Sequence, residues 1–262
     1  MQTDPQTEPQ TGPAEGSPPA NLDPVEVERF GRLAAEWWDT NGKLRPLHSQ
    51  GPARLGFIRE RLVRHFSCPT DGLKPLTGLK IVDVGCGGGL VSEPLARLGA
   101  DVMGIDPTTD SIAVARKHAE AQGLAIDYRT TSVEQLLADG ARFDAAVCME
   151  VIEHVPDPAA FVRSLGSIVR PGGLVIVSTL NRTWKSYGLA IVTAEYILGW
   201  LPRGTHDWNR FVTPEELSRF LVDAGCGAPE LSGIIYDVMS DTWRLSPDTG
   251  VNYIAAAPRL SG

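Results

Sequence analysis

The feature that most constrains the fold is a strand followed by a glycine-rich turn, K-I-V-D-V-G-C-G-G-G, at residues 80–89. Its β-branched residues predict a buried strand, which the glycines end. Residues 90–99 then have the pattern of a helix closed by Gly99. A second strand, residues 101–106, ends at Asp106. A strand, a helix and a further strand in this order predict a parallel crossover unit.

The same alternation of strands and helices continues along the chain. Helices are predicted at 110–123, 133–140, 158–169 and 215–225, and strands at 125–130, 143–149, 173–179, 230–237 and 251–257. Two more helices, at 24–39 and about 52–66, precede the first strand. The alternation therefore predicts an α/β fold with a doubly wound, mostly parallel sheet.

Composition places these elements in one domain, residues 24–262, with N-terminal helices over 24–70. Residues 1–23 are rich in Pro, Gln, Thr and Gly, so we expect a disordered tail. The net charge of −8 argues against binding to nucleic acid, which needs a basic surface. Because the tail has neither the basic start of a secretory signal nor the arginines of a transit peptide, we expect a cytoplasmic protein.

A strongly apolar segment, residues 183–202, interrupts the regular pattern. It contains Lys185 and Glu195 and is at the short limit for a membrane span, so we do not expect it to cross a bilayer. Two interpretations stay open for this helical insertion. It is a buried core helix, or, together with the residues up to 212, it is a lid or interfacial element that shields an apolar substrate.

The glycine turn does not match the common phosphate-binding motifs. The dinucleotide fingerprint G-x-G-x-x-G needs a third glycine where this chain has Leu90, and a P-loop needs a lysine that the turn lacks. Bare glycine backbone still allows a ligand to lie close, and the next helix offers N–H groups to a carboxylate. Asp106 can accept two hydrogen bonds from a ribose diol. A carboxylate together with a ribose describes S-adenosylmethionine (SAM).

The turn at 84–89, Asp106, the strand 143–149 and the turn 171–173 together resemble the seven-stranded, Rossmann-like SAM-dependent methyltransferases. Several short sequence segments are more specific, and they resemble the ubiquinone biosynthesis O-methyltransferases. They are EWWD (36–39), PLH (46–48), P-x-R-L-G (52–56), DVGCGGG (83–89), CMEVIEHVPDP (148–158), STLNRTWKS (178–186), AEYILGWLPRGTHDW (194–208) and VNY (251–253). The resemblance covers residues 28–257. It departs at 49–52, Ser-Gln-Gly-Pro, where the family pattern has a basic residue and an Asn before the proline.

This resemblance implies methyl transfer from SAM to a phenolic hydroxyl of two polyprenylated catechol-type acceptors, a 2-polyprenyl-6-hydroxyphenol and a 3-demethylubiquinol. The prenyl tail supplies a reason for the apolar segment 183–202. We therefore expect peripheral contact with the inner face of the cell membrane, and a complex with other enzymes of ubiquinone biosynthesis.

By the same resemblance, Arg54, Gly85, Asp106 and Met149 contact SAM. Gly85 allows close approach of the backbone, and Asp106 accepts hydrogen bonds from the ribose hydroxyls. Met149 packs on the adenine, although a methionine at the end of a strand also fits ordinary core packing. Arg54 is cationic, so it pairs with the methionine carboxylate, although a surface ion pair is its other interpretation.

The acceptor must lose a proton, because a phenol has a pKa near ~10. Glu150, Glu153 and His154 follow the strand 143–149. If their stretch is helical, they share one face and could hold Mg²⁺ or Zn²⁺, which would lower the pKa of a catechol. Alternatively, His154 alone is the catalytic general base. A third interpretation gives these side chains only capping or salt-bridge roles.

Two other functions stay open from the sequence. One is a SAM-dependent methyltransferase of a soluble small molecule, for which 183–202 would be buried core. The other is a non-catalytic scaffold with the same fold in a lipid-biosynthetic assembly. The complete glycine turn and Asp106 argue against the scaffold, because such a protein need not keep them.

Overall fold

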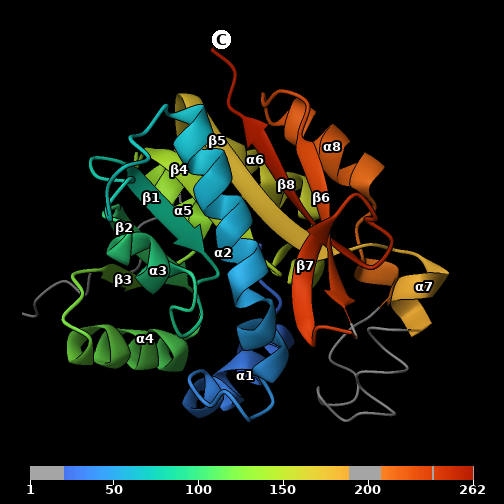
Figure 1. Cartoon of the computed structure of the whole chain (residues 1–262), viewed down its shortest axis with the longest axis horizontal. Coiled ribbons are helices and arrows are strands. Elements are labelled where there is room, and N and C mark those ends of the chain that lie inside the picture. Colours follow the sequence, from blue (N-terminus) through green and yellow to red (C-terminus); the bar gives the residue numbers. More distant parts are fainter. Residues whose placement is uncertain (1–20, 189–207, 238, 262) are drawn as a thin grey trace, which may run out of the picture.

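The structure, a computed structural model, describes residues 21–188, 208–237 and 239–261. Within these residues eight strands form one sheet. They are β1 (Lys80–Val84), β2 (Asp101–Asp106), β3 (Asp127–Thr130), β4 (Phe143–Met149), β5 (Val169–Leu180), β6 (Glu230–Asp237), β7 (Thr242–Ser246) and β8 (Asn252–Pro258). Their order is β3-β2-β1-β4-β5-β8-β6-β7 (Figure 1). The five strands from β3 to β5 are parallel, and β8, β6 and β7 join them antiparallel.

The helices surround this sheet. They are α1 (Pro24–Arg32), α2 (Arg45–His65), α3 (Ser92–Arg97), α4 (Thr109–Ala121), α5 (Val133–Ala138), α6 (Pro158–Ile168), α7 (Trp184–Ser186) and α8 (Pro214–Asp223). Three 3-10 turns, η1 (Ala34–Glu36), η2 (Ile152–His154) and η4 (Trp208–Arg210), lie between them. Figure 1 shows α2 crossing the near face of the sheet and α1 lying beyond one edge of it.

Two hydrophobic cores cover the two faces of the sheet. On one face, α5, α6 and α8 pack against the side chains of Ala146 and Cys148 of β4. On the other, α2 and α3 pack against Ala145 and Val147 of the same strand. Because consecutive residues of a strand point to opposite faces, this run is apolar at nearly every position. Burial on both faces confirms the predicted doubly wound, mostly parallel sheet.

The sheet has eight strands where the resemblance implied seven. The extra strand is β7, which forms an antiparallel hairpin with β6 at the edge of the sheet, from Gly233 opposite Ser246 to Asp237 opposite Thr242. Its sequence, T-W-R-L-S, contains one charge and two hydroxyl residues, and all five residues are exposed or half-buried. An edge strand with so little burial carries a weak apolar pattern, so the sequence did not indicate it.

The N-terminal helices also differ from their predicted bounds. The first α-helix ends at Arg32 and is followed by η1, so the predicted single helix over 24–39 is wrong. The second helix begins at Arg45, seven residues before the predicted start at Pro52, which lies inside it. A proline inside a helix has no N–H for the carbonyl four residues earlier, so α2 lacks the internal hydrogen bond that residue 52 would otherwise donate. Residues 1–20 of the predicted tail (1–23) lie outside the described residues. Asn21 and Asp23, by contrast, contact Asp157 and Arg210.

The apolar insertion lies mostly outside the described residues, which include only 183–188 of it. Within the described part, Thr183 caps the short helix α7 by a capping box with Ser186. No helix among the described residues is long and apolar enough to cross a membrane.

Candidate functional site

A cavity of about 770 Å³ lies at the carboxyl ends of β1, β2 and β4. Parallel α/β sheets bind ligands at this edge, where the strands end in loops. The four residues expected to contact SAM, Arg54, Gly85, Asp106 and Met149, all line the cavity. The structure therefore brings these four together, although they come from α2, β2, β4 and the turn after β1. Their contact with SAM stays a prediction.

Gly85 and Cys86 of the glycine turn line the cavity, and three positions of this turn favour glycine. Gly85, Gly87 and Gly89 have φ angles of +72°, +51° and +93°, in the left-handed region that other residues rarely adopt. A Cβ on Gly85 would lie 2.4 Å from Val151 Cγ2, and one on Gly87 would lie 2.2 Å from Trp37 Cζ2. The turn is therefore closely covered, and its glycines serve packing as well as ligand approach.

The tryptophans of the E-W-W-D word provide this cover. The Trp38 indole N–H donates a hydrogen bond to the Gly88 carbonyl (3.0 Å), and the Trp37 indole N–H donates to Ser111 Oγ (3.1 Å). These bonds join the segment after α1 to α4 and to the glycine turn. These tryptophans hold the N-terminal segment over the turn.

Asp106 is almost fully buried at the end of β2. Its Oδ1 accepts a hydrogen bond from the Thr108 amide (2.8 Å) and its Oδ2 accepts one from the Gly87 amide (3.0 Å). Burial raises the pKa of Asp106, and these two backbone bonds oppose that shift. Each carboxylate oxygen keeps one more lone pair, so the group can still accept bonds from a vicinal diol.

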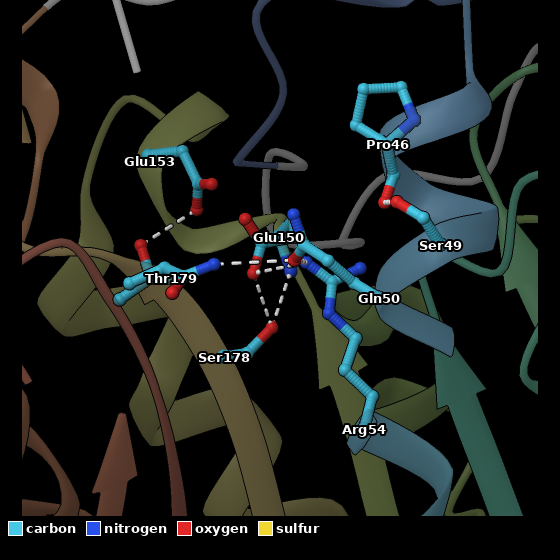
Figure 2. A network of polar contacts seen from close by, with 9 residues as sticks. Pro46, Ser49, Gln50, Arg54, Glu150, Glu153, Ser178 and Thr179 are labelled. Carbon is cyan, nitrogen blue, oxygen red and sulfur yellow. Dashed lines mark hydrogen bonds and ion pairs between the residues drawn. The ribbon is translucent and has the colours of Figure 1, made fainter. Parts of the chain in front are cut away.

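Arg54 lies at the centre of a buried polar network (Figure 2). Its Nη2 donates to Gln50 Oε1 (2.7 Å) and lies 3.1 Å from Glu150 Oε1, where Ser178 Oγ also donates (2.6 Å). Asn252 Nδ2 donates to the same Gln50 oxygen (3.2 Å). The Arg54 side chain is 6% exposed, so its pairing with Glu150 takes place away from bulk water. The surface ion pair considered from the sequence is wrong, because this pair is buried.

Of the two glutamates after β4, Glu150 has an unusual backbone conformation and Glu153 is buried. Glu150 has a φ angle of +56°, and its amide donates to the Ser178 carbonyl (3.1 Å). A left-handed glutamate is strained, and it persists only where its surroundings hold it. Glu153 is 3% exposed and accepts a hydrogen bond from Thr179 Oγ1 (2.8 Å). Burial, and next the charge of Glu150, raise the pKa of Glu153 to about 8.

His154, the expected general base, lies on the cavity wall beside α1. Its Nδ1 is 2.8 Å from Glu26 Oε2, and its ring meets Phe30 edge-on with 5.2 Å between centroids. Burial raises the pKa of Glu26, but the hydrogen bond and charge of His154 outweigh it and lower the pKa. When the imidazole is neutral and Nδ1 donates to Glu26, the lone pair is on Nε2, which is then the proton-accepting atom.

The expected metal site of Glu150, Glu153 and His154 is not formed. Their stretch is a left-handed residue followed by a 3-10 turn, so the three side chains do not share the face of an α-helix. Glu150 points to Arg54 and Ser178, Glu153 to Thr179, and His154 to Glu26. In the part of the chain that the structure describes, no group of three His, Cys, Asp or Glu is placed to hold a metal ion.

Sequence reasoning missed several residues of the cavity wall. Asp83, two residues before Gly85, is buried and accepts a 2.6 Å hydrogen bond from Ser92 Oγ. Burial raises its pKa to about 7. An aspartate inside an apolar strand was a signal of this environment. Gln50 and Asn252 carried no such signal, because an amide in a helix or at the start of a strand is common.

Known proteins resemble this chain over most of its length. A family model described as "Methyltransferase domain" matches residues 53–228. A ubiquinone biosynthesis O-methyltransferase of Azorhizobium caulinodans is 53% identical over 234 residues, which are 89% of this chain and 92% of that protein. One of Parvibaculum lavamentivorans is 52% identical over 240 residues, 92% of this chain and 95% of that protein.

A solved structure shares the fold at lower identity. Magnesium protoporphyrin IX methyltransferase from Synechocystis with bound SAH has a TM-score of 0.63 and 22% identity, and the match covers 90% of this chain and 98% of that one. The glycine turn, the aspartate at the end of β2 and the matches over nearly the whole length agree with each other. This chain belongs to the methyltransferase domain family and, within it, to the ubiquinone biosynthesis O-methyltransferases.

Proposed function

We propose that this protein transfers a methyl group from SAM to a phenolic hydroxyl of polyprenylated catechol-type intermediates of ubiquinone biosynthesis. The acceptors are a 2-polyprenyl-6-hydroxyphenol and a 3-demethylubiquinol. The observation that carries the proposal is the single cavity that joins the glycine turn and Asp106 to a buried polar cluster and to His154. Relatives about half identical over nearly the whole chain support the pathway.

The residues present fit SAM. Arg54 lines the cavity, and its buried Nε has no hydrogen-bond partner among the described residues, so this side chain suits the methionine carboxylate. Asp106 has lone pairs for the ribose hydroxyls, and Met149 at the end of β4 offers an apolar surface to the adenine. When bound, SAM supplies a methyl group attached to a positively charged sulfur. Loss of the methyl group leaves this sulfur as a neutral thioether.

The chain's own residues then have two tasks. They hold the phenolic oxygen in line with the methyl carbon, and they remove its proton, because a phenol is mostly protonated near neutral pH. His154 Nε2 accepts that proton while Glu26 holds Nδ1. The oxygen forms the new bond to carbon as the carbon–sulfur bond breaks, and the proton stays on the imidazole until it passes to solvent.

The acceptor end of the cavity is apolar. Leu180, Val251, Ile234 and Trp243 line it, from β5, the residue before β8, and the hairpin of β6 and β7. An aromatic ring with a prenyl substituent has the matching chemistry. A soluble, polar acceptor would leave this wall without a matching surface, which favours the prenylated class over the soluble alternative.

We also propose that the protein is cytoplasmic and contacts the inner face of the membrane through the apolar segment that begins at residue 183. Trp184 and Tyr187, at its described start, are 79% and 41% exposed. Large exposed aromatic side chains are frequent at membrane interfaces. Flotation with anionic vesicles tests this, because the wild type should float and a variant with Trp184→Ser and Tyr187→Ser should float less. A complex with other enzymes of the pathway stays an expectation from the family.

The function is tested with purified protein, SAM and a short-chain 3-prenylcatechol. Methylated product would support the proposal, and Asp106→Ala should reduce it. No product from the catechol, while SAM still binds, would overturn the prenylated acceptor and favour a soluble one.

The same assay with EDTA and then added Mg²⁺ or Zn²⁺ separates the two ways of activating the phenol. Activity that is indifferent to EDTA leaves His154 as the base. Activity that vanishes and returns with metal would mean that acceptor binding rearranges Glu150, Glu153 and His154 into ligands, away from their present partners.

A further inference from the structure

The hairpin of β6 and β7 forms one wall of the cavity, and this wall is largely apolar. Ile234 and Tyr236 of β6 and Trp243 of β7 line the cavity. Tyr236 lies opposite Trp243 in the hairpin, and the centroids of their rings are 5.5 Å apart. Ile234 and Trp243 pack into the core beneath α2, and residues two apart on a strand share a face. All three residues therefore lie on the face of the sheet that α2 covers.

A row of positions on this face leads from the buried polar network to the hairpin. Leu180 of β5 lies opposite Asn252 of β8, whose Nδ2 donates to Gln50 of α2 (3.2 Å). This pair therefore faces α2, as Ile234 of the next strand does. Ser178, two residues before Leu180, belongs to the polar network (Figure 2). Three strand spacings of about 4.8 Å, roughly 14 Å in all, separate β5 from β7.

The first half of α2 covers the same path. Pro46, Leu47 and Gln50 of this helix line the cavity. Further along the helix, Phe57 and Ile58 belong to the core against which the hairpin packs. Figure 1 shows α2 and β7 beside one another on the near face of the sheet, and the two elements are in contact. The cavity therefore continues as a groove between α2 and the hairpin.

The outer end of this groove is open and apolar. Tyr236 is 38% exposed, and Met239, in the turn after β6, is 95% exposed. The Tyr236 hydroxyl donates to Asp241, which holds the ring in place. Lys185 and Asp248 also line the cavity, but they form an ion pair with 2.5 Å between Nζ and Oδ2. A hydrocarbon chain gains free energy against apolar side chains and not against a hydrated ion pair, which favours the hairpin.

We propose that the groove between α2 and the hairpin of β6 and β7 binds the prenyl tail of the acceptor, and that Ile234, Tyr236 and Trp243 select prenylated catechols over catechols without a tail. The inference rests on the proposed function, to which it adds the wall that recognises the tail. These residues bind the substrate and take no part in the bonds that form or break. The edge strand β7 then has a role in substrate selection, because it supplies Trp243.

The test compares 3-geranylcatechol, which has a ten-carbon tail, with 3-methylcatechol. Wild-type protein should have a higher kcat/KM for the geranyl acceptor, by roughly 10-fold or more, because each buried carbon of the tail adds to binding. Trp243→Ala should lower the ratio of the two kcat/KM values by roughly 5- to 20-fold. KM should change more than kcat, because the tail is remote from the methyl carbon. Calorimetry with SAM shows that the cofactor half is intact.

Leu245→Ala is the matched control. Leu245 lies on the same strand and the same face as Trp243, and both are half-buried against the same core. Leu245 is not on the described wall of the cavity. Its truncation therefore removes packing from the hairpin without changing the groove, and the ratio of the two acceptors should equal that of the wild type.

Each outcome decides the inference. A wild type without preference for the geranyl acceptor, or a Trp243→Ala variant with the wild-type ratio, would overturn the tail subsite and leave the proposed function standing. If the wild type binds SAM but methylates neither acceptor, the proposed function fails and the inference fails with it. If Trp243→Ala does not fold, Tyr236→Ser decides, because this exposed residue contributes less to the core. A lower ratio in Tyr236→Ser supports the subsite, and an unchanged ratio overturns it.

Discussion

At the scale of single residues, the site contains two buried carboxyl groups, Asp106 and Glu153, whose surroundings favour different protonation states. Asp106 is buried but accepts two backbone hydrogen bonds, which favour its ionised form. Burial, and next the charge of Glu150, favour the protonated form of Glu153, and the hydrogen bond from Thr179 opposes them only in part. Their surroundings therefore suit Asp106 to bind hydroxyl donors as an anion, and Glu153 to hold a proton.

Asp106→Ala should weaken SAM binding by about 1.5–3 kcal/mol, the worth of hydrogen bonds to a charged acceptor. Calorimetry with SAM measures this loss. Asp101→Ala is the control, because Asp101 is exposed at the opposite end of the same strand. An affinity equal to that of the wild type would remove Asp106 from the cofactor site.

Glu153→Gln should change how stability depends on pH. Folding raises the pKa of Glu153 from 4.5 to about 8. Between these two pH values, the folded chain therefore keeps a proton that the unfolded chain releases. The free energy of unfolding of the wild type, relative to Glu153→Gln, should therefore fall as pH rises from 4.5 to about 8 and then level off.

The fall is at most about 1.4 kcal/mol per pH unit. Urea unfolding at several pH values measures it, and Glu120→Gln, an exposed carboxyl on α4, should show no such trend. A difference between wild type and Glu153→Gln that does not vary with pH would show that Glu153 ionises normally.

At the scale of elements, the turn between β1 and α3 needs its glycines for its backbone conformation. A glycine in α2, by contrast, is not required by the fold. Gly87 combines a φ angle of +51° with close contact to Trp37, so the turn and the segment after α1 fit one another. Gly56 lies on the exposed side of α2, and a Cβ there would meet nothing within 4 Å. The same substitution should therefore have opposite effects at the two positions.

Gly87→Ala should destabilise the protein by more than about 1 kcal/mol, from backbone strain and displacement of Trp37. Gly56→Ala should stabilise it by about 0.5–1 kcal/mol, because alanine loses less backbone freedom in a helix. Chemical unfolding of both variants measures this. A neutral Gly87→Ala would mean that the turn relaxes without cost.

At the scale of the whole molecule, residues from the two ends of the chain meet at the site. Glu26 of α1 contacts His154, and Gln50 of α2 accepts a hydrogen bond from Asn252, 202 positions away. Figure 1 shows α1 at the edge of the sheet where β1 points. The first helix thus lines the cavity, although it lies outside the alternating strands and helices.

Glu26→Gln tests this contribution. Loss of the carboxylate that holds His154 should lower kcat by roughly 10-fold, a part of what a positioned base supplies, with SAM affinity unchanged. Steady-state kinetics measure it. Glu28→Gln, on the exposed side of the same helix, is the control. Equal kcat in the two variants would show that Glu26 does not position the base.

The sequence by itself determined the cofactor half of this protein. The turn 84–89, Asp106 and Met149 lie within or next to strands whose apolar runs and glycine ends are local signals, and the carboxyl ends of parallel strands must meet at one edge. The short segments that resemble the family added Arg54 to these predicted residues. Local patterning is sufficient here because each of these residues is placed by its own strand or turn.

Only the tertiary structure decided the acceptor half. The exposed edge strand β7, the left-handed Glu150, the separate partners of Glu150, Glu153 and His154, and the wall formed by Gln50 and Asn252 all depend on contacts between distant segments. A short sequence pattern cannot show which distant side chain will satisfy a buried polar group. That choice is made when the helices before the sheet and the strands after it pack around one cavity, and burial then sets which polar atoms stay without a partner.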